Sequence, residues 1–292
     1  LRDKYPVSNS EHAIMLGDMA TEQPKQKIFR FNPGKTETIF PPKHPYYKAP
    51  KEEKKVIETI LSEDVEQQRI ATLREQLPAN LTDEEKDAIA AHNRELEKQL
   101  GIVIGKPMSV EEADKQSANP NYSKSYGYTI NCQTCAPAYA LRLMGFDITA
   151  KSHTPGSLSE YLSRQRSFEA GTNIDGSPIQ PVRTYDWMQK KGYKRMTPLR
   201  YKEYFEEACN ETGVYILTIG WRGGGGHATI LQRFENGELC YIEPQHYVER
   251  IGAKRSITEL CTSGSTTPIY TRGIARVDNK LFVPKFLSIF DK

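Results

Sequence analysis

Three strand-like runs close together in the C-terminal half constrain the fold more than any other feature of the chain. They span residues 214–221, 227–234 and 239–243 and are rich in β-branched and aromatic side chains. Asn236-Gly237 separates the last two runs, and this dipeptide is a strong signal for a β-hairpin. Strands joined by so short a connection pair antiparallel. The sequence therefore predicts an antiparallel sheet in this part of the chain.

Segments with helical spacing surround these runs, so the predicted fold class is α+β. Apolar residues recur every three or four positions in them, and glycine or proline marks several of the ends. Beyond residue 105 we expect a short helix from Ser109, longer helices at 134–144, 158–166, 184–191 and 200–211, a short strand at 146–150, and strands or a packed tail at 265–290.

The first hundred residues have a different character. Residues 1–50 hold seven of the 18 prolines and little periodicity, which predicts an extended arm or linker. Residues 51–105 are highly charged with apolar positions at helix spacing, interrupted by a proline at position 78. We interpret them as a helical hairpin that acts as a spacer or docking element. The remaining domain is then 106–292.

A capping box supports the second helix of this hairpin. Thr82 is followed by Glu85 three residues later, the pattern in which each side chain bonds the other residue's backbone N–H. The helix is expected to run to about Leu100.

Composition excludes several classes of protein. The 40 basic and 37 acidic side chains give a net charge of +3 without a basic cluster, which argues against nucleic-acid binding. No apolar stretch approaches the ~20 residues that span a bilayer. Five cysteines are too few for a disulfide scaffold. The chain begins with Leu1 rather than Met, so we interpret it as processed or trimmed.

A candidate nucleophile stands in the segment Asn131-Cys132-Gln133-Thr134-Cys135, at the start of an expected helix. A thiol at a helix N-terminus lies among unpaired N–H groups and near the positive end of the dipole, which favours the thiolate. Cys132 is equally compatible with a small buried apolar side chain.

The Cys132-x-x-Cys135 spacing also occurs at zinc sites and in thioredoxin-like redox pairs. Zinc would need two further ligands, but Cys209, Cys240 and Cys261 are isolated from one another. A redox pair is expected after a parallel-strand βαβ unit, which this sequence does not indicate. We therefore expect no metal, no cofactor and no disulfide at these two cysteines.

A candidate base and acid lie in the predicted hairpin. His227 directly follows four glycines and opens a strand, and Glu243 and Gln245 end the returning strand. A cysteine hydrolase needs a base that takes the thiol proton and a third group that orients the base. A histidine and a carboxylate on paired strands supply both.

The register of the hairpin decides whether these side chains can meet. A two-residue turn would pair His227 with His246 and turn Glu243 to the other face. A three-residue loop, or one with a glycine bulge, would pair His227 with Gln245 and place Glu243 on the same face as the histidine. Catalysis requires the second register.

Around these residues the sequence resembles the papain-fold toxin domains of bacterial polymorphic toxins and phage-borne effectors, some of which are similar to glutamine deamidases. The resemblance covers about residues 108–248. Its motifs are Asn-Cys-x-x-Cys at 131–135, Leu-Arg-x-x-Gly at 141–145 followed by Phe-Asp, Gly-His-Ala at 226–228 and acid-Pro-Gln at 243–245. Residues 106–113 and 119–122 resemble segments that precede this domain in phage minor head proteins.

The resemblance implies a papain-like fold in which the catalytic helix packs on the antiparallel sheet. It makes Cys132 the nucleophile, His227 the general base and Glu243 the orienting acid, although the family usually has Asp at the last position. Asn131 would offer an amide near the oxyanion, and Gln245 would flank the site. Cys135 is the alternative nucleophile, because in papain-like proteases the helix starts at the second of two cysteines.

The function expected from this resemblance is an effector toxin that deamidates glutamine on a target protein. A papain-like protease and a transglutaminase-like enzyme share the same chemical steps. A third hypothesis is a catalytically silent phage or secretion component. Expected partners are the target protein and, through residues 1–105, an immunity, carrier or virion protein, with delivery into the cytoplasm of a target cell.

Overall fold

The computed structural model describes residues 51–115, 117–164, 166–221, 225–246, 254–262, 266–267 and 273–292, with side chains from residue 62 onward except at positions 221, 255, 259, 262, 266 and 267. The arm predicted at 1–50 lies outside the described residues. Contacts divide the chain into residues 1–56 and 57–292, and the second unit holds the elements below apart from the start of the first helix. Helices and strands are both abundant in it, which confirms the α+β class.

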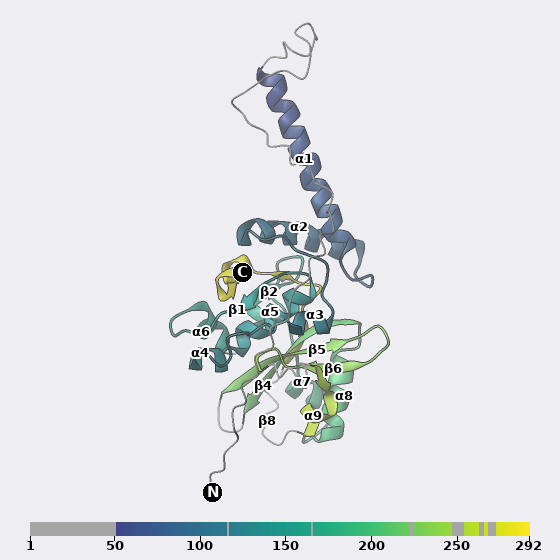
Figure 1. Ribbon diagram of the computed structural model, residues 1–292. Coiled ribbons are helices and arrows are strands. Elements are labelled where there is room, and N and C mark those ends of the chain that lie inside the picture. The colour runs from purple at the N-terminus through teal and green to yellow at the C-terminus, as the bar shows by residue number, and fades with distance from the viewer. Residues whose placement is uncertain are drawn as a thin grey trace, which may run out of the picture. The chain divides into compact units, whose positions relative to one another are not determined.

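A seven-stranded antiparallel sheet lies at the centre of this unit (Figure 1). Its order is β3-β9-β4-β5-β6-β7, and β8 pairs the end of β4. The three strands predicted first are its middle and agree with the prediction to within one residue at each end. The strand bounds are β3 (Val182–Arg183), β4 (Gly213–Trp221), β5 (Gly226–Arg233), β6 (Leu239–Ile242), β7 (Lys254–Ser256), β8 (Thr266–Thr267) and β9 (Gly273–Arg276).

Helices cover both faces of the sheet (Figure 1). Side chains alternate along a strand, so Ile216 and Ile230 join the core under one helix layer and Leu217 and Leu231 join the core under the other. The first layer is α5 (Cys132–Leu143), and the second consists of α7 (Thr184–Lys190), α8 (Pro198–Ala208) and α9 (Ile257–Thr262).

Helix α5 begins two residues earlier than expected, at Cys132, and ends at Leu143. Pro137 therefore lies in the second turn of the helix. Because proline has no N–H, the carbonyl of Gln133 receives no bond from that position. The strand expected at 146–150 is reduced to β1 (Thr149–Ala150).

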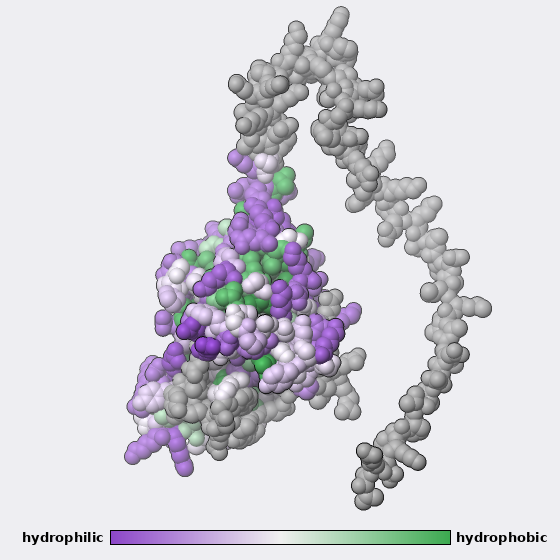
Figure 2. All heavy atoms as spheres, turned by 90° about the vertical axis from the view of Figure 1, so that its left-hand side faces the viewer, coloured by the Kyte–Doolittle hydropathy of each residue, from purple (hydrophilic) through white to green (hydrophobic). Residues whose placement is uncertain are grey.

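Two helices form in the charged segment, α1 (Lys51–Glu75) and α2 (Asp83–Leu100). The predicted capping box is present: the Glu85 N–H donates to Thr82 Oγ1 (3.1 Å) and the Thr82 N–H to Glu85 Oε2 (2.9 Å). Figure 2 shows hydrophilic residues over most of the coloured part of α1 that faces the viewer.

The apolar face of α2 belongs to the main core rather than to a separate hairpin. Ala90, Leu96 and Leu100 are buried in the same cluster as Tyr139 of α5. Residues 57–292 form one contact unit, so no division of the contacts falls at the boundary predicted between 105 and 106.

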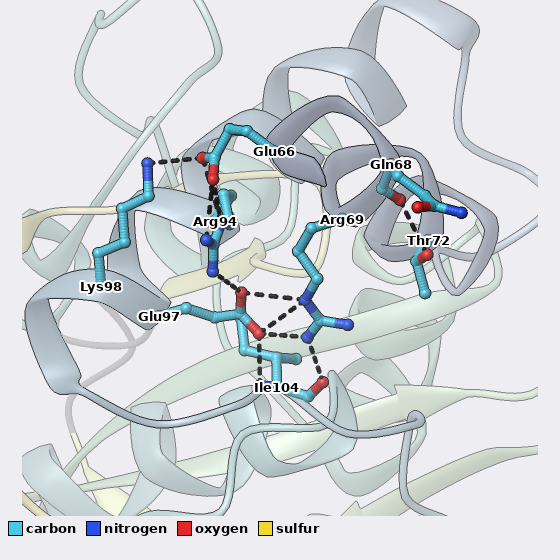
Figure 3. Close-up of polar contacts among 8 residues, drawn as sticks. All are labelled: Glu66, Gln68, Arg69, Thr72, Arg94, Glu97, Lys98 and Ile104. Atoms are coloured by element: carbon cyan, nitrogen blue, oxygen red, sulfur yellow. Dashed lines mark hydrogen bonds and ion pairs between the residues drawn. The ribbon is translucent and has the colours of Figure 1, made fainter. Parts of the chain in front are cut away.

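Charged side chains join α1 to α2 around one buried carboxylate (Figure 3). Glu97 is 2 % exposed and accepts from Arg69, from Arg94 Nη1 (2.9 Å) and from the Ile104 N–H (2.7 Å). Arg94 also bonds Glu66 through Nη2 (2.8 Å). A buried charge is tolerated only when it is paired in this way.

Short elements complete the unit. They are α3 (Val110–Lys115), α4 (Tyr126–Thr129), α6 (Leu158–Ser163), η2 (Ser167–Ala170), β2 (Gly171–Thr172), β10 (Leu281–Phe282), η4 (Pro284–Ile289) and β11 (Phe290–Asp291). Strand β1 pairs β11 and β2 pairs β10, so the chain end packs against the middle of the sequence as a tail. None of the described helices is long and apolar enough to cross a membrane.

Candidate active site

The start of α5 presents the candidate nucleophile. Asn131 caps the helix with its carbonyl, which accepts from the N–H groups of Thr134 (2.9 Å) and Cys135 (3.0 Å). The N–H groups of Cys132 and Gln133 precede these first intrahelical bonds, so they belong to the helix N-terminal donors that have no acceptor one turn before them.

The β5–β6 hairpin adopts the register that catalysis requires. The Phe234 N–H donates to the Glu238 carbonyl (2.9 Å) and the Gly237 N–H to the Phe234 carbonyl (2.9 Å), which closes a three-residue loop. Gly237 has φ +82°, the left-handed conformation that favours glycine. The ladder pairs Ile230 with Ile242. Continued to the strand ends, this register sets positions 227 and 245 opposite each other.

The structure brings Cys132, His227 and Glu243 together. His227 Nε2–H donates to Glu243 Oε2 over 2.7 Å, and the Cys132 side chain hydrogen-bonds the same ring. With Nε2 engaged by the carboxylate, the other ring nitrogen is the one left for the sulfur. The side chains from the helix start and from the two hairpin strands thus form one hydrogen-bonded chain in the predicted order.

Glu243 is fixed by donors on both of its oxygens. Besides His227, the Tyr241 hydroxyl donates to Oε2 (2.7 Å) and the Gln245 N–H to Oε1 (3.0 Å). Glu243 as a whole residue is 7 % exposed. Burial alone would raise its pKa, but the bond and charge of His227 and these two donors lower the pKa to about 2. The group is therefore ionised at neutral pH.

His227 is held in its protonated form. Burial works to lower the pKa of its ring, but the hydrogen bonds that the protonated ring donates to Cys132 and Glu243 and the charge of the carboxylate outweigh burial and raise the pKa to about 10. An imidazolium between a sulfur and a carboxylate is the ion-paired arrangement that a thiol nucleophile needs.

Asn131 has a different role from the one expected. Its Nδ2 donates to Asn119 Oδ1 (3.2 Å) and to the Lys151 carbonyl (3.0 Å), so both amide hydrogens are engaged within the protein. Its Oδ1 accepts from Gln245 Nε2 (3.3 Å). Asn131 therefore ties the helix start to the end of the hairpin instead of facing an oxyanion. Gln245 flanks the site as predicted, with its carbonyl bonded by Asn119 Nδ2 (3.0 Å).

Cys135 lies in the apolar core, one turn further along α5. It is 0 % exposed, against 4 % for Cys132. Burial, together with the nearby Cys132 and Glu243, raises the pKa of the Cys135 thiol well above its ordinary value. These surroundings favour a neutral, inert thiol, so the geometry favours Cys132 as the reactive cysteine.

No disulfide is found among the described residues, and the thiols at 132 and 135 are not bridged to each other. Among the described residues no group of three or more Cys, His, Asp or Glu side chains is placed to hold a metal ion.

Two contributors were not identified from the sequence. Tyr241 lies in β6, two positions before Glu243, which directly follows this strand, so the period of two already places both side chains on one face. Asn119 gave no comparable local signal, because its partners Asn131 and Gln245 are distant in sequence.

A cleft of about 340 Å³ opens beside His227. Gln133 lines it from α5, Gly226 from the start of β5, and Gly225 from the residue before that strand. Gln133 follows Cys132 and Gly226 precedes His227 in the chain, and both line a space large enough for a substrate side chain.

In comparisons with known proteins, the chain matches no family model, no curated protein and no solved structure.

Proposed function

We propose that this chain is a cysteine-dependent amidohydrolase in which Cys132 is the nucleophile, His227 the acid and base, and Glu243 the orienting carboxylate. The observation that carries the proposal is the ring of His227, bonded by Glu243 at Nε2 and by Cys132 on its other side. A catalytic triad is recognised by this order of contacts rather than by sequence position.

The reaction follows from the protonation of these groups. In the resting ion pair the thiol proton already resides on His227, and the Cys132 sulfur attacks a carboxamide carbon to form a tetrahedral intermediate. His227 gives the proton to the leaving nitrogen, which departs as ammonia and leaves a thioester. Water, deprotonated by the same ring, attacks the thioester and releases a carboxylic acid and the free thiol. The sum is amide plus water to acid plus ammonia.

The developing oxyanion needs donors that the Asn131 side chain does not supply. We assign this role to the N–H groups of Cys132 and Gln133 at the start of α5, which have no acceptor one helical turn before them. They point from the positive end of the helix dipole, which favours a negative charge there.

The arrangement supports a papain-like fold, since a helix with the cysteine at its start packs on an antiparallel sheet that carries the histidine. Together with the motif resemblance, it supports an effector toxin that deamidates glutamine on a target protein inside a recipient cell. Partners that dock through residues 1–105 would use surfaces other than the buried face of α2.

Expression in a bacterial cytoplasm tests this function. Wild-type protein should slow growth, while Cys132→Ala should not, and Cys135→Val should retain the effect because that thiol is packed in the core. Equal growth of wild type and Cys132→Ala would contradict the toxin hypothesis.

Mass spectrometry of a glutamine-containing protein incubated with the enzyme distinguishes deamidation from cleavage and from amine transfer. Deamidation replaces an NH₂ by an OH without breaking the chain. Fragments in place of that mass change would assign the site to a protease, and conjugates with an added amine would assign it to transfer.

A further inference from the structure

The cleft beside His227 carries positive charge without a compensating carboxylate in its described wall. Arg164 and Arg183 both line it, while the other described lining residues are uncharged apart from the histidine. A concave surface with one sign of charge concentrates oppositely charged ligands and steers their approach.

The two arginines come from different elements, and few carboxylates of the described chain neutralise their charge. Arg164 caps the end of α6, where its Nη2 bonds Glu160 Oε1 (2.8 Å). That carboxylate is shared, because the Gly156 N–H donates to its other oxygen (2.6 Å). Arg183 is exposed at the end of β3, and no ion pair to it is found within the described part of the chain.

A third group in the cleft lacks a hydrogen-bond partner. Gln133 Oε1 is buried and accepts no bond from the described residues. A buried carbonyl oxygen without a donor costs free energy, so this position favours a ligand that brings an N–H. Gln133 follows Cys132 directly, and the N–H would therefore lie beside the reacting carbonyl.

We propose that the substrate is a peptide segment that carries an aspartate or glutamate close to the reactive glutamine. The acidic side chain pairs with Arg164 and Arg183 at the cleft wall, and an N–H of the segment donates to Gln133 Oε1. This inference rests on the proposed function for the identity of the reactive group, but the charge preference is a property of the cleft itself.

Peptide binding to the Cys132→Ala protein tests the preference without turnover. Two fluorescent peptides that differ only in Asp against Asn beside one glutamine are titrated by anisotropy at low salt. We expect the Asp peptide to bind about fivefold more tightly, as for solvent-accessible ion pairs, with the advantage decreasing as salt is added.

Charge-reversal variants locate the preference. Arg183→Glu and Arg164→Glu should each remove it, and the milder Arg183→Gln should reduce it. Arg195→Glu is the matched control, since Arg195 is exposed, lies outside the cleft and undergoes the same change of charge. It should keep the wild-type preference.

Equal binding of the two peptides, binding of neither, or a preference that survives in both cleft reversals would overturn the proposal. Ammonia release by the wild-type enzyme is measured separately on both peptides. Release without charge preference rejects the acidic substrate and keeps the hydrolase, whereas charge-selective binding without release rejects the hydrolase and keeps the basic cleft.

Discussion

At the scale of single residues, Glu243 organises the candidate site. It accepts from His227, Tyr241 and the Gln245 N–H, so its position and its charge are both fixed. The carboxylate in turn sets the orientation and the proton affinity of the histidine that faces Cys132. A change at Glu243 should therefore affect chemistry much more than folding.

Glu243→Gln keeps the size of the side chain and removes its charge. We expect the turnover number to decrease by a few orders of magnitude, since an orienting carboxylate in a triad is worth up to about 10⁴. The far-ultraviolet circular dichroism should not change. Activity equal to that of the wild type would show that Glu243 does not orient the base.

The same variant should change how stability depends on pH. The pKa of Glu243 is lowered to about 2, so its contribution is present above its ordinary value of 4.5 and is lost as the pH falls from 4.5 toward 2. The pKa of His227 is raised to about 10, so its contribution is present below 6.5 and is lost as the pH rises toward 10.

Urea unfolding at several pH values measures this effect. The difference in free energy of unfolding between wild type and Glu243→Gln should be largest near pH 4.5–6.5 and shrink on both sides. A difference that is constant across the pH range would mean that the pair does not interact as described.

At the scale of elements, the β5–β6 hairpin decides the site through its register. The three-residue loop depends on the left-handed conformation of Gly237, whose added Cβ would meet no atom within 4 Å. Any cost of substitution there is therefore one of backbone conformation. A slip by one residue would turn Glu243 away from His227.

Gly237→Ala should lower stability by about 1 kcal/mol, because alanine is disfavoured in the left-handed region. Gly176→Ala is the matched control, since Gly176 has φ +80° and equally open surroundings in another turn. Thermal unfolding should show similar losses for both variants, while only Gly237→Ala should lower activity. Unchanged activity in Gly237→Ala would remove the loop from the determinants of the site.

The sequence predicted these elements because their signals are local. The strands, the capping box at Thr82 and the helix after Asn131 each depend on spacing within a few residues. These local signals do not determine the register, since Asn236-Gly237 fits both a two-residue and a three-residue turn. The pairing of Ile230 with Ile242 distinguishes the two, but it becomes visible only when both strands are packed on α5.

The position of Asn131 could not be predicted in the same way. Nearness to Cys132 in sequence suggested an oxyanion donor, but its amide is taken by Asn119 and the Lys151 carbonyl. These contacts arise from tertiary packing between segments, and no local sequence pattern predicts them.

At the scale of the whole unit, α1 and α2 stabilise the part that carries the site. The buried carboxylate of Glu97 connects Arg69 of α1, Arg94 of α2 and the Ile104 N–H that follows (Figure 3). These bonds lower the pKa of Glu97 against the effect of burial, which would raise it. The helices are thus part of the same folded structure as α5.

Glu97→Ala should therefore destabilise residues 57–292 as a whole, by about 3 kcal/mol, because two arginines and a backbone N–H lose a buried partner. Glu66→Ala is the control on the same network. Its side chain is 29 % exposed, and surface ion pairs contribute little to stability, so the loss should be much smaller than for Glu97→Ala. Equal losses in urea unfolding for the two variants would indicate a hairpin that is only loosely attached.

The most direct test of the Cys132–His227 pair is the rate at which iodoacetamide alkylates Cys132, followed by peptide mass mapping across the pH range. In the wild type, Cys132 should react selectively at neutral pH, and Cys135 should remain unmodified in the core. In His227→Ala, Cys132 should react at least about tenfold more slowly at neutral pH. Equal rates in the two proteins, or preferential alkylation of Cys135, would contradict the assignment of nucleophile and base.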